Sequence, residues 1–254
     1  MCSLSSDMNT IHPLALDELT WTDVAAHLAR DPRLLLPVGA LEQHGPHLPL
    51  GTNILIAGRI VADLSLESGV LRAPVLNYGV NVPSERAYAG TATLRPKTLH
   101  RLLNELLITW EDQGFEEFIV ITAHRHEPHL DALTTLATER ARVRIVSIWD
   151  VDISHLLEAQ PGPLHADEAE TSLLLHLFPD RVRMDRARDF DLPPDEFERY
   201  LHGRLPAPPP GGAGVVGRPT AATAQKGRRI YEHILGTVRR CVFRSPDPVD
   251  SDAL

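Results

Sequence analysis

Residues 34–53 read LLLPVGALEQHGPHLPLGTN, and this stretch decides the fold of the chain. Its first part, 34–38, is apolar and predicts a short buried strand. The strand leads directly into a polar loop, rich in glycine and proline, that contains Glu42, His44 and His47. In open α/β sheets, ligands bind in the loops beyond the carboxyl ends of the strands. The loop after this strand is therefore the first place to expect a functional site.

Short apolar runs and amphipathic stretches alternate outward from this loop. Further strands are predicted at 70–78, 118–121 and 143–149. Helices are predicted at 55–66, 99–110, 130–142, 168–177 and 221–240. Short apolar strands separated by helices are typical of the α/β class, so we expect a three-layer α/β/α fold with a mostly parallel central sheet.

Length and composition indicate how many domains to expect. The chain has 254 residues, of which 43% are hydrophobic and 23% charged, enough for one large domain with a buried core. Residues 205–217 are rich in proline and glycine and predict a loop rather than the core of a second domain. We predict a single domain over residues 1–245, followed by a disordered acidic tail at 246–254.

Several classes of protein are excluded by charge and composition. A net charge of −9 argues against binding along a nucleic-acid backbone, which requires clustered positive charge. No apolar run approaches the roughly 20 residues that a membrane span needs. Residues 1–13 lack the basic flank and apolar run of a secretory signal, and Cys2 and Cys241 cannot form a disulfide framework. We therefore expect a cytoplasmic protein that binds neither nucleic acid nor membranes.

Metal-capable side chains gather in three places along the chain. The groups are Glu42, His44 and His47 with Asn53; His124, His126, Glu127 and His129; and His165, Asp167, Glu168 and Glu170. Each group alone is weak evidence, but the chain has only 13 histidines, and two of the groups directly follow predicted strands. Histidine and carboxylate together suit zinc, manganese, iron or nickel. These patterns favour a metal site.

Four motifs, in order along the chain, resemble those of one known family. Residues 37–53, PVGALEQHGPHLPLGTN, closely resemble the creatininase signature PVGSxEQHGPHLPLGTD. The segments YAGT (88–91), HADEAETS (165–172) and GVVGRPTAATAQKG (214–227) resemble the family elements Y/FPGT, HAGExETS and GxxGdPxxATxxKG. The chain is identified on these motifs as a divergent member of the creatininase (creatinine amidohydrolase) family.

The resemblance implies an α/β/α fold, assembly into homo-oligomers, commonly hexamers, and a two-metal site that hydrolyses C–N bonds. Known members open cyclic amides such as creatinine, remove formyl groups, or trim a peptide during cofactor maturation. In the family pattern, Glu42 and His124 hold one metal and His44 holds the other. Asn53 stands where the family has a bridging aspartate, and His126 where creatininase has a glutamate ligand.

These two departures change the charge of the site. The family ligand set carries about three negative charges, whereas the matching set here has one carboxylate, that of Glu42. Two divalent ions about 3.5–4 Å apart repel each other by several kcal/mol, even at an effective dielectric constant of about 20. We therefore predict one divalent ion per chain, Zn, Mn or Fe, with Glu127 or Glu168 able to restore some charge.

The resemblance also suggests roles in catalysis. His165 matches the histidine that passes a proton to the leaving nitrogen, and Glu168 or Glu127 is the predicted base near the attacking water. Ser84, Arg86 and Arg125 are predicted to bind the substrate. Guanidinium groups clasp carboxylates or phosphates, and Arg86 replaces the histidine of the family's SxEH stretch.

Two alternatives stay open at this point. The loss of the bridging carboxylate is also consistent with a noncatalytic protein that keeps the fold for binding or assembly. A His-rich site with one carboxylate also resembles single-metal iron sites, so a lyase, isomerase or oxygen-using enzyme on the same fold is a further hypothesis. Metal content separates the first alternative from the hydrolase, and oxygen-dependent turnover separates the second.

Overall fold

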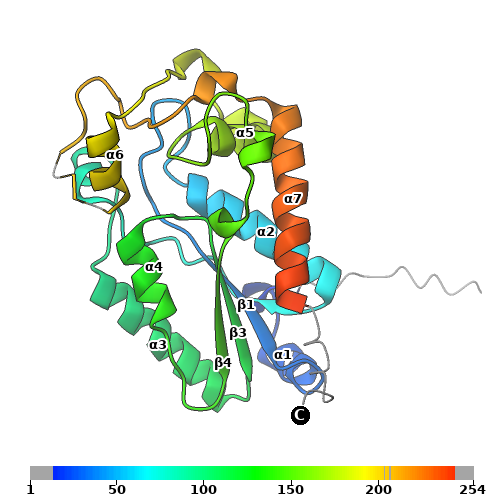
Figure 1. Cartoon of the computed structure of the whole chain (residues 1–254). Coiled ribbons are helices and arrows are strands. Elements are labelled where there is room, and N and C mark those ends of the chain that lie inside the picture. Colours follow the sequence, from blue (N-terminus) through cyan, green and yellow to red (C-terminus); the bar gives the residue numbers. More distant parts are fainter. Residues whose placement is uncertain (1–13, 203, 206, 244–254) are drawn as a thin grey trace, which may run out of the picture.

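The computed structural model describes residues 14–202, 204–205 and 207–243, which are built around one β-sheet (Figure 1). The strands are β1 (Arg33–Val38), β2 (Leu71–Arg72), β3 (Glu117–Thr122) and β4 (Arg142–Ser147). They lie in the order β2, β1, β3, β4, and each neighbouring pair is parallel. The predicted parallel sheet is confirmed.

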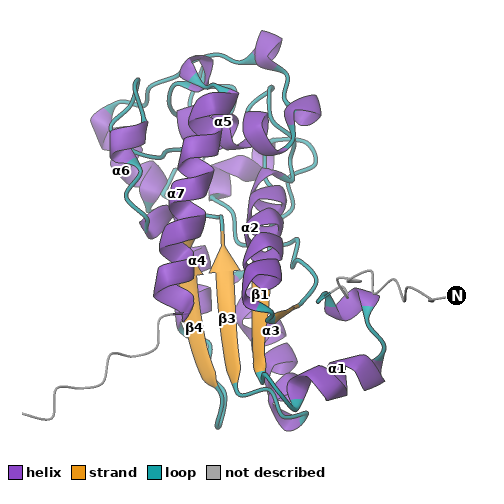
Figure 2. Cartoon of the chain, turned by 90° about the vertical axis from the view of Figure 1, so that its right-hand side faces the viewer, coloured by secondary structure: helices purple, strands orange, loops and turns teal. Residues whose placement is uncertain are grey.

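Helices cover both faces of this sheet. They are α1 (Trp21–Leu28), α2 (Thr52–Ser68), α3 (Pro96–Asp112), α4 (Glu127–Thr134), α5 (Glu168–Leu177), α6 (Pro194–Leu201) and α7 (Ala224–Phe243). Successive strand residues point to opposite faces. Leu35 and Ile119 therefore pack against α2, α5 and α7, whereas Leu34 and Phe118 pack against α1, α3 and α4. Figure 2 shows α2 and α7 on the face turned to the viewer, and the three-layer α/β/α prediction is confirmed.

The helix predicted at 130–142 is wrong at both ends. α4 begins at Glu127 and ends at Thr134. The Glu111 carboxylate of α3 accepts hydrogen bonds from the backbone N–H groups of residues 139–141. These bonds hold the segment before β4 as a loop, because a backbone group bonded to a side chain is not available to a helix.

Other elements differ in extent or were not predicted. The strand predicted at 70–78 is reduced to β2, although Leu76 still exchanges backbone hydrogen bonds with the end of β1. α1 and α6 were missed, although Thr20 and Asp23 form a capping box at the start of α1, which is a recognisable signal. Residues 205–217 form a loop where they are described, and the predicted tail at 246–254 lies outside the described residues.

The carboxyl ends of β1 and β3 lie side by side, and this position determines where the site forms. Val38 and Thr122 are partners in the parallel register, so the loops that follow them start at the same edge of the sheet. Gly39 allows close packing there, since a Cβ at this position would lie 2.8 Å from Ile54 Cα. The first turn of α2, with Asn53, is thereby held against the loop. No helix in the described part of the chain is both long and apolar enough to cross a bilayer.

Candidate metal centre

The loop after β1 contributes a fully buried carboxylate and a fully buried imidazole. His44 Nδ1 donates a hydrogen bond to the backbone carbonyl of Glu42 at 3.0 Å, because that oxygen can only accept. This bond places a proton on Nδ1, so Nε2 is the ring nitrogen of His44 that can bind a metal ion. An imidazole held in this way by its second nitrogen is the usual arrangement for a metal ligand.

The loop after β3 brings two more histidines, both oriented by one backbone carbonyl. His124 Nε2 and His126 Nδ1 donate to the carbonyl oxygen of Val80 at 2.8 Å and 3.0 Å. His124 Nδ1 then lies 3.0 Å from Glu42 Oε2 and 3.1 Å from Asn53 Nδ2. Asn53 Nδ2 also donates to Glu42 Oε2 at 2.9 Å. The two strand-end loops therefore meet at Glu42.

Several buried polar atoms in this region have no hydrogen-bond partner among the described residues, and three of them are His44 Nε2, Asn53 Oδ1 and His126 Nε2. Buried polar atoms are rarely left unpaired in proteins. All three are acceptors or lone-pair donors of the kind that coordinates divalent ions. The residues present thus fit a metal ion.

The third cluster, at the start of α5, completes the group. One ligand atom each from Glu42, His44 and His165 lies within 4.8 Å of the others. Glu170 Oε2 accepts from the backbone N–H of Ala166 at 2.6 Å, and its Oε1 lies 3.6 Å from His44 Nε2. The His165 ring lies 4.6 Å from the His44 ring, centroid to centroid.

The electrostatics of these groups favour positive charge between the carboxylates. Burial raises the pKa of Glu42, but His124 and His165 outweigh burial and hold it well below its usual range. Burial lowers the pKa of His44, but the carboxylates of Glu170 and Glu42 raise it overall to about 9. A site that holds protons this tightly also attracts a cation, which competes for the same atoms.

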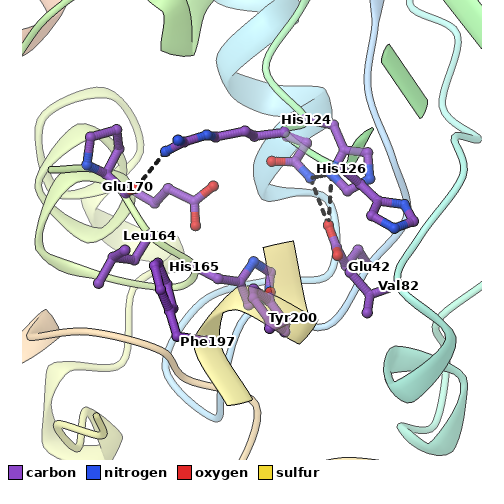
Figure 3. Close-up of a pocket in the computed structure, with 12 residues that line it drawn as sticks. Glu42, Val82, His124, His126, Leu164, His165, Glu170, Phe197 and Tyr200 are labelled. Atoms are coloured by element: carbon purple, nitrogen blue, oxygen red, sulfur yellow. Dashed lines mark hydrogen bonds and ion pairs between the residues drawn. The ribbon is translucent and has the colours of Figure 1, made fainter. Parts of the chain in front are cut away.

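A small cavity opens beside these groups, with an interior volume of about 30 Å³. Figure 3 shows His124, His126 and Glu42 along one side of it, with Phe197 and Tyr200 along another. Its lining residues are Glu42, Asn53, Val82, His124, Arg125, His126, Pro163, Leu164, His165, Glu170, Phe197 and Tyr200.

The two glutamates predicted as catalytic bases lie away from this cavity. Glu168 is buried in an ion pair with Lys226 and accepts hydrogen bonds from two backbone N–H groups. Glu127 is exposed and pairs with His202 at 2.7 Å. Glu170 is the carboxylate that α5 turns toward the centre. Residues two apart on a helix point in different directions, so Glu168 and Glu170 cannot share one face.

The three predicted substrate residues have different surroundings. Arg125 lines the cavity, and its Nη1 donates to the backbone carbonyl of Pro163 at 2.7 Å. Ser84 is buried, and its hydroxyl has no hydrogen-bond partner among the described residues. Arg86 is exposed and does not line the cavity.

Sequence reasoning assigned no role to several groups now seen at the site. Glu170 was visible in the HADEAETS motif, but its neighbour Glu168 was preferred. Glu85 is a further buried carboxyl group; burial, together with nearby Glu42, raises its pKa to about 8. Phe197 and Tyr200 come from α6, which gave no recognised signal in the sequence.

A parallel α/β sheet with a buried histidine–carboxylate centre at its carboxyl edge is typical of metal-dependent enzymes of the α/β class. Comparison with known proteins identifies the group more narrowly. The family model described as "Creatininase: Creatinine amidohydrolase" matches residues 17–242. The chain therefore belongs to the creatininase family, which confirms the resemblance seen in its motifs.

Relatives and solved structures agree with this assignment. The chain is 33% identical to the mycofactocin precursor peptide peptidase of Mycobacterium ulcerans, over 85% of this chain and 87% of that protein. It is 28% identical to the creatinine amidohydrolase of Pseudomonas putida, over 85% and 90% of the two chains. A mutant creatininase described as of Zn-Zn type superposes with a TM-score of 0.75 at 26% identity, covering 90% of this chain and 96% of that one. The predicted enzyme class, an amidohydrolase-type hydrolase, is supported at this level.

Proposed function

We propose that this protein is a metal-dependent hydrolase that cleaves a C–N bond of an amide, cyclic amide or formamide in a small or peptide-derived metabolite. The observation that carries the proposal is the set of unpaired buried atoms: His44 Nε2, Asn53 Oδ1 and His126 Nε2. They lie around carboxylates that favour positive charge. Unpaired buried atoms next to ionised carboxylates support the binding of a divalent ion at this point.

The proposed ligands are Glu42, His44 and His124, with Asn53 and His126 completing the set. Glu170 adds a second carboxylate within 3.6 Å of His44 Nε2. Two negative charges balance a single divalent ion, so we propose one ion of zinc, manganese or iron per chain. Such an ion, when bound, lowers the pKa of a water and polarises a carbonyl group.

The protein's own groups have separate roles around that ion. Glu170 Oε1 is the proposed acceptor of the proton from the attacking water, in place of Glu168 and Glu127, which are engaged elsewhere. His165 is the proposed donor to the leaving nitrogen, since it lines the cavity beside His44. These assignments give the acid and the base to two different side chains beside His44.

Arg125 is the proposed contact for an anionic part of the substrate. It lines the cavity from its exposed rim, and only one of its guanidinium nitrogens is bonded, to the carbonyl of Pro163. A guanidinium group has five N–H donors, so others stay free to bind a carboxylate. By family resemblance, we also propose a cytoplasmic homo-oligomer.

Metal analysis combined with a hydrolysis assay tests the proposal. Purified wild type should contain about one divalent ion per chain, and His124→Ala should lose it together with hydrolysis of at least one of creatinine, N-formyl amino acids or short peptides. Two full equivalents of metal would contradict the charge argument. If no loading condition gives bound metal, the protein is a noncatalytic member of the family. Oxygen-dependent turnover with ferrous ion would instead indicate the iron-type alternative.

A further inference from the structure

Among the described residues that line the cavity, only Tyr200 has a hydroxyl group. The residue belongs to α6, and Phe197, three positions earlier on the same helix face, lines the cavity with it. The Tyr200 ring centroid lies 6.1 Å from that of His165, the proposed donor to the leaving nitrogen. Tyr200 therefore faces the reacting groups rather than solvent.

The Tyr200 ring packs against other side chains, whereas its hydroxyl forms no hydrogen bond with a described residue. The side chain packs with Val82, Leu205 and Val216 in a small apolar cluster, separate from the two cores beside the sheet. The residue is 8% exposed, and no hydrogen bond joins its hydroxyl to another described residue. The ring is thus held in place while the O–H group is left free toward the cavity.

The charge around Tyr200 determines what its hydroxyl can do. Burial first, and then the carboxylates of Glu85, Glu42 and Glu170, raise its pKa well above the ordinary value. The phenol therefore keeps its proton at any physiological pH. A neutral phenol that cannot ionise acts as a hydrogen-bond donor toward an oxygen that gains negative charge.

The other donors that line the cavity have partners or other proposed roles, and Arg125 is the proposed contact for an anionic part of the substrate. His165 is the proposed donor to the leaving nitrogen, and Asn53 Nδ2 donates to Glu42 Oε2 at 2.9 Å. The Tyr200 hydroxyl remains as a neutral donor that forms no hydrogen bond with a described residue. Hydrolysis of a C–N bond moves negative charge onto the carbonyl oxygen, which is then stabilised by such a donor.

We propose that Tyr200 is a catalytic residue whose hydroxyl donates a hydrogen bond to the substrate carbonyl oxygen, and that α6 positions this donor over the metal centre. The inference rests on the proposed function and adds to it a group that stabilises the transition state. It also assigns α6 a function, namely to complete the site from the side opposite the histidine ligands.

The test compares wild type with Tyr200→Phe and with Tyr78→Phe. Tyr200→Phe removes only the hydroxyl and keeps the ring in its apolar cluster. Tyr78→Phe removes the same group from a residue that is 48% exposed and outside the cavity. Metal content and thermal unfolding should match wild type in both variants. On any compound that wild type hydrolyses, Tyr200→Phe should lower kcat and kcat/KM alike, by about 10²-fold.

A binding measurement checks the same contact without turnover. Acetohydroxamic acid, titrated into zinc-loaded protein by calorimetry, presents a carbonyl oxygen to the site. Its Kd should rise roughly tenfold in Tyr200→Phe, as loss of one hydrogen bond to a charged oxygen predicts, and should not change in Tyr78→Phe. If active wild type and Tyr200→Phe share the same kcat and Kd, the role of Tyr200 is overturned while the proposed function stands. If wild type binds no metal and hydrolyses nothing, both fail together.

Discussion

Two glutamates at the start of α5, Glu168 and Glu170, are both buried and face two different regions of the molecule. Glu168 faces α7, where Lys226 and two backbone N–H groups satisfy its carboxylate. Glu170 faces the candidate metal centre, where one oxygen is held by a backbone N–H group and the other lies 3.6 Å from His44 Nε2. The first carboxylate is fully paired, and the second is only half paired.

This difference separates a structural carboxylate from the one that we propose to act in catalysis. Burying a charge is costly unless it is paired and hydrogen-bonded, so a fully paired carboxylate has nothing left to offer a ligand. The α5–α7 contact also requires Gly227, since a Cβ there would lie 1.8 Å from the carbonyl oxygen of Ser172. The two helices are thus joined tightly beside Glu168. Glu170, in contrast, keeps one carboxylate oxygen that can bind a ligand or accept a proton.

The largest expected effect is on stability, from breaking the Glu168 side. Lys226→Met leaves Glu168 buried without its cation, which should lower the free energy of unfolding by about 3–5 kcal/mol. Urea unfolding followed by circular dichroism measures it. The matched control is Arg101→Met, which breaks an exposed pair with Glu105 and should leave the midpoint unchanged. Equal midpoints for both variants would show that the buried pair is not structural.

The next effect is on catalysis, from changing the Glu170 side. Glu170→Gln keeps the shape but removes the proton acceptor, so kcat should fall by about 10²- to 10³-fold, with the unfolding midpoint close to that of wild type. Steady-state hydrolysis on a substrate of the wild type measures this. Glu105→Gln, at an exposed position on α3, serves as the control. If Glu170→Gln lowers the unfolding midpoint but not kcat, Glu170 is a structural carboxylate and not the proton acceptor.

The sequence was sufficient to predict where the candidate site lies in the fold, because apolar runs determine where strands end. The groups after β1 and β3 follow such runs directly, so Glu42, His44 and His124 could be assigned to one edge of the sheet. The signature motifs then identified the family and the proposed ligand set. Position relative to a strand end is local information, and the sequence carries it.

Orientation was not predictable in the same way. Helix geometry shows that Glu168 and Glu170 point about 200° apart, but only packing against Lys226, far along the chain, decides which one faces inward. Phe197 and Tyr200 depend on α6 in the same way, since their apolar partners Val82 and Val216 come from distant loops. Long-range partners of this kind leave no local pattern to read.

Glu85 extends the comparison to a buried carboxyl group with even fewer partners. Its Oε2 has no hydrogen-bond partner among the described residues, and burial with nearby Glu42 raises its pKa to about 8. The unfolded chain ionises near pH 4.5, so between these values the folded state binds more protons and stability falls as pH rises, by up to about 1.4 kcal/mol per pH unit.

Glu85→Gln removes this titration. The variant should therefore show a flatter dependence of the unfolding midpoint on pH, and it should be more stable than wild type at pH 8 and above. Thermal unfolding of metal-free protein from pH 5 to pH 9 measures both curves. Parallel curves for wild type and Glu85→Gln would show that Glu85 ionises normally in the folded protein.

A smaller effect is expected from restoring the carboxylate that the family has at position 53. Asn53→Asp replaces Nδ2, which lies 2.9 Å from Glu42 Oε2, with a carboxylate oxygen. The added negative charge should bring the total charge of the ligands close to that of a two-metal site. We expect a second divalent ion to bind at least tenfold more tightly than in wild type, because each added carboxylate offsets repulsion between the ions. Metal titration followed by calorimetry measures both steps. A single step with unchanged stoichiometry would mean that charge does not set the ion count.

The smallest effect is predicted for Glu127, the other carboxylate that sequence reasoning considered as the base. It is exposed and paired with His202, and an exposed ion pair of this kind contributes little. Glu127→Gln should therefore leave kcat, metal content and the unfolding midpoint unchanged, in contrast to Glu170→Gln on the same substrate. The pair also links the start of α4 to the residue that follows α6, so a change in KM alone would indicate that this link helps α6 to hold Tyr200 over the cavity. A loss of kcat that matches Glu170→Gln would instead make Glu127 the base and would mean that the loop carrying it turns inward during turnover.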